Sequence, residues 1–234
     1  AAIRATDRLL ATGASGTRRI HGQFTRARAL VASGSVDEGL AQARAGIAAY
    51  AGAYGPNDWH VGSAHEQLAE TLVRRHLLED ADAEAAKAIE FLTGSKSEPD
   101  TLNEARVVRS LCASRRGHAA EALADAQLVA NGLTADTPLS GRLLPLLAVG
   151  EAALGKGDTA LALSTLERAA EAAESAEDYP ELHADVHLAL ARALFKAGAD
   201  PARARDVADR AATEYEGCAM PELARQARAV GKRE

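Results

Sequence analysis

The chain has 234 residues, a formal net charge of −6 and a hydrophobic fraction of 47%, to which aromatic residues contribute only 3%. This charge creates no positive field that would favour nucleic acid, and no apolar run approaches the roughly 18 residues of a membrane-spanning helix. Cys112 and Cys218 are too few and too distant for a disulfide framework, so we expect a reducing, cytoplasmic compartment.

The apolar residues are mostly alanine, which favours helices and allows them to approach closely. No stretch alternates with period two in the manner of a strand. The sequence therefore predicts an all-α protein in which thin helical layers pack closely. Cys112, beside Leu111, fits this picture as a small core residue.

Helix-breaking residues divide the chain into pairs of helices: Gly55-Pro56 ends the first pair, and Gly157 lies in the turn within the fourth pair. Asp37 is a candidate N-cap for the second helix of the first pair. No linker separates the pairs, so we predict a single domain over residues 1–234. Its predicted parts are a leading helix at 1–12, five repeats at 17–53, 56–93, 99–132, 138–176 and 179–217, and a capping helix at 220–231.

Small and apolar residues recur in the second helix of each predicted pair at steps of 40–42 residues. A period of this length indicates a solenoid, because one helix pair cannot bury enough apolar surface to offset its ordering entropy without neighbours. The recurring triplets are Gly39, Ala43, Gly46; Ala81, Ala85, Ala88; Ala122, Ala126, Val129; Ala162, Leu166, Ala169; and Ala204, Ala208, Ala211.

The pattern resembles the tetratricopeptide repeat (TPR). That family places a large and then a small residue in the first helix, and small residues seven apart in the second helix. The second, fourth and fifth pairs fit through Leu68-Ala69, Val149-Gly150 and Leu190-Ala191. The segment Tyr54-Gly55-Pro56-Asn57-Asp58 is similar to the linker of the longer subtype, found in kinesin light chains and bacterial signalling proteins.

The chain departs from the family pattern at four positions. Arg26 stands where a large apolar residue is usual, and Arg109-Ser110 replaces the large-then-small pair. His76 occupies the position of the turn glycine. The first and third repeats are therefore the least regular.

The resemblance implies a right-handed α-solenoid whose first helices line a concave groove, and a non-catalytic protein-interaction scaffold without cofactor or metal. Gln67 is the favoured partner contact, because an amide can hydrogen-bond an extended peptide backbone. The repeat register places Glu66 in the groove as well. The predicted groove residues are Arg28, Ser63, Gln67, Glu70, Arg74, Glu104, Arg115, Glu151, Asp185, Arg192 and Lys196. The expected partner is a protein or peptide, or another domain of the same polypeptide.

Other chemistry-bearing residues have structural interpretations. His183 and His187 are four residues apart, as two metal ligands on one helix would be, but no third ligand is evident and His187 falls at a packing position. Trp59 is predicted to pack its linker onto the preceding helix. The paired carboxylates of the second helices are expected on solvated faces.

Three other functions remain open at this stage. The chain could be a regulatory or sensor segment of a larger bacterial signalling protein, such as a serine/threonine kinase or a transcriptional regulator. It could bind a small ligand, or catalyse a reaction, inside the solenoid. It could also self-associate through its end helices, as truncated arrays expose apolar faces.

Overall fold

The structure is a computed structural model that describes residues 2–11, 16–93, 99–134, 136–174, 179–198 and 200–232. These described residues form helices and no strand, so the all-α prediction is confirmed. The chain divides into two compact units, Ala1–Arg109 and Ser110–Glu234, and α6 crosses from the first into the second.

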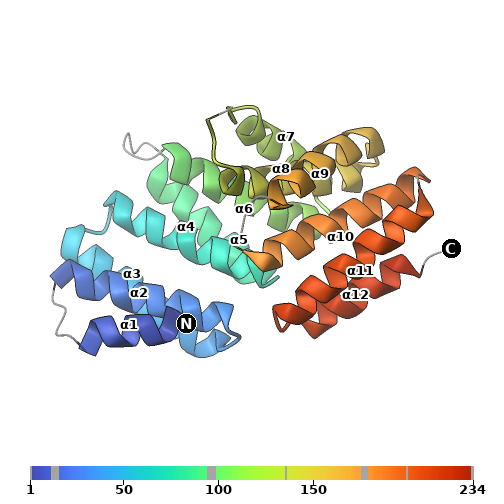
Figure 1. The fold of residues 1–234 in the computed structure, drawn as a ribbon. Coiled ribbons are helices and arrows are strands. Elements are labelled where there is room, and N and C mark those ends of the chain that lie inside the picture. Colours follow the sequence, from blue (N-terminus) through green and yellow to red (C-terminus); the bar gives the residue numbers. More distant parts are fainter. Residues whose placement is uncertain are drawn as a thin grey trace. The chain divides into compact units, whose positions relative to one another are not determined.

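The N-terminal unit is built from antiparallel helix pairs (Figure 1). Helix α2 packs on α3 and α4 packs on α5, while α4 also contacts α2 and α3 of the preceding pair. First helices thus lie beside first helices, which is the arrangement that a stacked repeat requires. The helices of this unit are α1 (Ala2–Ala11), α2 (Gly16–Ala32), α3 (Val36–Tyr54), α4 (Trp59–Arg74), α5 (Leu78–Leu92) and the start of α6 (Pro99–Arg115).

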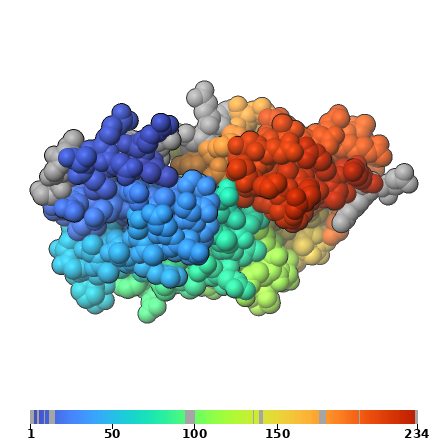
Figure 2. All heavy atoms as spheres, turned by 90° about the horizontal axis from the view of Figure 1, so that it is seen from below, coloured from blue at the N-terminus to red at the C-terminus, as the bar shows by residue number. Residues whose placement is uncertain are grey.

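The C-terminal unit repeats this arrangement. Helix α8 packs on α9 and α10 packs on α11, and α10 also contacts α8 and α9. Helix α12 lies along α11, and the space-filling view shows these red segments packed together (Figure 2). The helices that lie wholly in this unit are α7 (Ala119–Ala130), α8 (Leu139–Lys156), α9 (Thr159–Glu174), α10 (Pro180–Ala197), α11 (Pro201–Gly217) and α12 (Pro221–Gly231).

The recurring small residues form the seams between helices. Ala81, Ala85 and Ala88 of α5 are fully buried, as are Ala204 and Ala208 of α11. Buried alanines shorten the distance between helix axes, so apolar surface is covered with few large side chains. In the third pair, Val129 is only half-buried, at the end of its seam.

Two of the departures from the repeat pattern have a local structural explanation. His76 adopts a positive φ of 57°, the left-handed conformation that a glycine supplies at this turn of other repeats. Ser110 is buried and its hydroxyl donates to the carbonyl oxygen of Ala122 at 2.6 Å, so a polar residue fits between α6 and α7. Cys112 is buried beside it, as predicted for a core residue.

Two predictions about helix starts and packing are wrong. Asp37 is not the N-cap of α3, because the helix begins at Val36 and the Ser35 carbonyl accepts from the amide of Gly39. Trp59 does not lie in the linker: it is the first residue of α4 and packs against the buried cluster of Ala88, Leu92 and Ala105. The cap that does form at α4 is Asp58, whose carboxylate accepts from the amide of His60 at 3.0 Å.

Candidate functional site

In the N-terminal unit, polar side chains of two first helices bond to one another. Arg28 of α2 donates from Nη1 to Oε1 of Gln67 at 2.7 Å and from Nε to Oγ1 of Thr71 at 3.0 Å. Gln67 in turn donates from Nε2 to Oγ of Ser63 at 3.2 Å. The half-buried Gln67 amide is therefore held in one orientation. A primary amide offers two donors and two lone pairs, and these bonds use one of each.

A buried carboxyl group lies on the same helix. Glu66 is 3% exposed, and its Oε1 has no hydrogen-bond partner among the described residues. Burial raises the pKa of Glu66 well above its ordinary value, and the charges of Glu70 and Glu104 raise it further, against the opposing effect of Arg28 and Arg74. Glu70 and Arg74 form an ion pair one turn apart, and Glu104 is exposed.

Replacing Glu66 with glutamine is expected to stabilise the protein by about 0.5–2 kcal/mol at pH 7.5. The pKa of Glu66 in the folded protein lies above its value of about 4.3 in the unfolded chain. Protonated Glu66 therefore contributes its full stability below a pH of about 4.3, and this contribution is lost as the pH rises through the folded-state pKa. Urea denaturation at pH 7.5 and below pH 4 measures the effect, which is expected only at the higher pH. Glu90→Gln, at an exposed position of α5, is the control and is expected to show no such gain. Destabilisation by Glu66→Gln at pH 7.5 would contradict this interpretation.

The C-terminal unit holds a denser polar network, centred on Arg115. Its guanidinium binds Glu151 through two bonds, Nε to Oε2 at 2.9 Å and Nη2 to Oε1 at 3.0 Å, and also binds Oδ2 of Asp185 at 2.9 Å. The hydroxyl of Tyr215 donates to the other oxygen of Asp185. One cation thereby joins the first helices α6, α8 and α10, and Tyr215 adds the second helix α11.

The electrostatics of this network follow from its burial. The side chains of Arg115, Glu151 and Asp185 are 10%, 14% and 3% exposed. Burial acts to lower the pKa of Arg115, but the charges of Glu151 and Asp185 outweigh it and the net shift is upward. Burial, reinforced by Asp185, raises the pKa of Tyr215. Arg115 therefore keeps its charge and its bonds to both carboxylates, so the first role of the network is to hold helices together.

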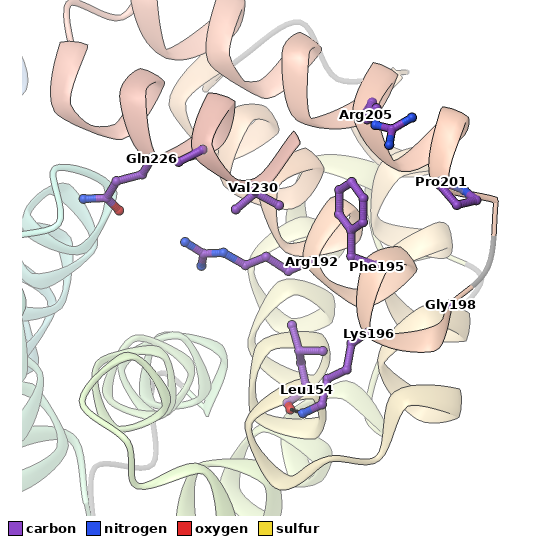
Figure 3. Close-up of a pocket in the computed structure, with 10 residues that line it drawn as sticks. Leu154, Arg192, Phe195, Lys196, Gly198, Pro201, Arg205, Gln226 and Val230 are labelled. Carbon is purple, nitrogen blue, oxygen red and sulfur yellow. Dashed lines mark hydrogen bonds between the residues drawn. The ribbon is translucent and has the colours of Figure 1, made fainter. Parts of the chain in front are cut away.

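The remaining predicted groove residues line a cavity of about 940 Å³ within the C-terminal unit (Figure 3). Arg192 and Lys196 project into it from α10, and Arg205 lines it from α11. Lys196 donates from Nζ to the Leu154 carbonyl oxygen at 2.8 Å, near the C-terminal end of α8. Arg192 and Arg205 are exposed and make no hydrogen bond or ion pair with any described residue.

Two buried histidines each lie against a carboxylate. His187 is buried and its Nδ1 lies 2.7 Å from Oε2 of Glu214, as His65 lies 2.6 Å from Glu84. Burial lowers the pKa of His183, which favours the neutral form of its ring. Across the described ranges, no group of three or more His, Cys, Asp or Glu side chains is placed to hold a metal ion.

The predicted groove residues thus fall into groups that differ in their contacts. Gln67 and its neighbours form one bonded group, Arg115 and its carboxylates form another, and Arg192 with Lys196 lines a cavity. Sequence reasoning missed Tyr215, Arg205 and Gln226. The sequence did contain an indication that Tyr215 is a packed residue, since it is one of only four tyrosines and lies four residues after the seam position Ala211.

Comparison with known proteins finds a similar structure but no similar sequence. No family model matches the chain, and no curated protein matches it. Its structure is similar to the crystal structure of a Rap protein complexed with competence and sporulation factor, with a TM-score of 0.72 and 11% sequence identity. The match covers 95% of this chain and 61% of that one, so the chain spans about three fifths of that neighbour's length.

This similarity, together with the helix pairing, shows a TPR-like helical-repeat fold with a terminal capping helix, and confirms the predicted α-solenoid class. The longer subtype stays a prediction. None of the helices in the described part of the chain is both long and apolar enough to cross a membrane.

Proposed function

We propose that the chain is a non-catalytic protein-interaction scaffold that binds a peptide or protein segment on the surface of its first helices. The observation that carries the proposal is the orientation of the Gln67 amide, fixed by Arg28 from the neighbouring first helix. The fold supports it, because the similar Rap protein was crystallised in a complex with competence and sporulation factor. The single domain over residues 1–234 and the cytoplasmic location remain part of this proposal.

A fixed, half-exposed amide suits an extended backbone, which presents one N–H and one C=O at each residue. Within the described residues, the Gln67 amide bonds only to Arg28 and Ser63. One of its N–H groups and one of its oxygen lone pairs therefore stay available to a peptide backbone. Because the amide is already ordered, binding costs less side-chain entropy than it would with a free glutamine. Glu70 and Glu104, which are more exposed than Arg74, would contact the side chains of the partner.

A peptide array followed by fluorescence anisotropy on the captured peptides tests the proposal. Gln67→Ala is expected to weaken binding about tenfold, which corresponds to the loss of one or two neutral hydrogen bonds. Arg28→Ala is expected to weaken binding by a similar factor, because Gln67 then loses its fixed orientation. Both variants should be compared at equal folded fraction, judged by circular dichroism.

Gln42→Ala is the matched control. Gln42 lies on the second helix α3, and its amide is also held from both ends, by Arg26 at 2.7 Å and by Glu38 at 2.9 Å. We expect Gln42→Ala to bind peptides with the same affinity as the unaltered protein. An array that captures no peptide would overturn the proposed function, and equal losses for Gln67→Ala and Gln42→Ala would overturn the assignment to the first helices.

A further inference from the structure

The cavity of the C-terminal unit differs in charge from the chain that forms it. Among the described residues, its lining includes Arg192, Lys196 and Arg205 and no acidic residue, although the chain as a whole carries a net charge of −6. We infer that this cavity is a binding site for an acidic peptide segment that carries a large apolar side chain. The inference rests on the proposed function and names the class of peptide that the scaffold takes.

The cations are arranged to receive a carboxylate. Lys196 already bonds to the Leu154 carbonyl oxygen, but Arg192 and Arg205 have no partner among the described residues and come from different helices. Gln226 of α12 adds an exposed amide, again without a bond to the described residues. Because a guanidinium donates through a planar fork, two of them can bind separate carboxylates of one segment.

The rest of the lining is apolar. Leu154 and Phe195 are half-buried, and Val230, at the C-terminal end of α12, is 6% exposed. In Figure 3 the side chains of Arg192, Phe195 and Val230 surround the same space. This combination favours a ligand with an apolar anchor between charged groups, because the anchor gains from burial while the cations of the lining select for negative charge.

Helix α12 therefore has two roles in this inference. Its buried face, through Ala224, Ala227 and Val230, covers α11 as a cap. Its adjacent face supplies Gln226 and Ala229 to the cavity, which Val230 also lines. A capping helix that only shields the end of an array needs a polar outer face and no such cavity.

The test measures fluorescence anisotropy of a labelled eight-residue peptide, Glu-Asp-Glu-Phe-Leu-Glu-Asp-Glu, with the full chain. Two further peptides replace the acidic residues by lysine or the Phe-Leu pair by serines. We expect saturable binding of the first peptide only, with an affinity that falls as salt is raised. The double variant Arg192→Glu with Arg205→Glu is expected to weaken this binding about tenfold or more.

Two variants serve as controls. Arg192→Lys with Arg205→Lys keeps the charge and should retain most of the affinity. Arg168 is an exposed arginine of α9 that lies outside the cavity and makes no bond to any described residue. Arg168→Glu should therefore leave peptide binding unchanged. The thermal midpoint of every variant is expected to match that of the unaltered protein, since the replaced arginines make no bonds to the described residues.

The inference is overturned if the lysine peptide binds as tightly as the acidic one, or if Arg192→Glu with Arg205→Glu has no more effect than Arg168→Glu. In either case, peptides whose binding depends on Gln67 would leave the proposed function standing. Capture of no peptide at all, by contrast, would remove the proposed function itself.

Discussion

Replacing Arg115 with methionine is expected to lower the free energy of unfolding by about 3–5 kcal/mol, the cost of leaving buried charges without their partner. The substitution keeps most of the side-chain volume but removes the cation that binds Glu151 and Asp185. Asp185 would still accept from Tyr215, but Glu151 would lose both of its bonds to the guanidinium. Helices α6, α8 and α10 would lose the group that joins them.

Urea denaturation followed by circular dichroism measures this loss. Arg109→Ala, at an exposed position of the same helix, is the matched control and should change stability by less than about 0.5 kcal/mol. An apolar replacement of the whole network should recover most of the lost stability, because no charge is then buried alone. That variant combines Arg115→Met, Glu151→Leu, Asp185→Leu and Tyr215→Phe. A loss below about 1 kcal/mol for Arg115→Met would show that the network contributes little.

The helix pairs were predictable because their signal is local and repeated. A small residue at the position of Ala81 recurs near Ala122, Ala162 and Ala204, and each of these alanines is buried as the register requires. Even the departures preserve the backbone, since His76 adopts the left-handed conformation expected of a glycine. Repetition therefore compensated for a sequence that has few aromatic residues to mark its core.

The bonds within the candidate site were not predictable from the same register. The register places Arg28 and Gln67 on first helices, but it does not say that a side chain will reach a residue 39 positions away. Likewise, Tyr215 belongs to a second helix and yet donates to Asp185 of a first helix. Such bonds depend on rotamers and on interhelical distance, neither of which a single sequence specifies.

The cavity was missed for a related reason. Sequence reasoning placed Arg192 and Lys196 in a groove, but treated the last helix only as a cap. The contribution of Gln226 depends on how α12 is rotated about its axis, which is fixed by the burial of Ala224 and Ala227 against α11. The small-residue spacing of α12 indicates its buried face, whereas the surroundings of its other faces come from the packing of α10 and α11.

Replacing Gly150 with alanine is expected to destabilise the C-terminal unit by about 1–3 kcal/mol, the usual cost of overpacking a core. A Cβ at this position of α8 would come within 2.5 Å of Cδ2 of Leu166, closer than real Cβ contacts allow. Leu166 is fully buried in α9, so its side chain cannot swing out into solvent to relieve the overlap. The penalty should appear although alanine favours a helix over glycine by about 1 kcal/mol.

A double-mutant cycle tests whether this contact is the cause. Leu166→Ala alone should cost about 2–5 kcal/mol through the cavity that it leaves. Combined with Gly150→Ala, the new methyl group occupies part of that cavity, so the two losses should fall short of additivity by about 0.5–3 kcal/mol. Gly52→Ala in α3 is the control, since a Cβ there meets nothing within 4 Å and should stabilise the helix by about 0.5–1 kcal/mol. If Gly150→Ala also stabilised the protein, α8 and α9 could not approach as closely as the small residue at this position indicates.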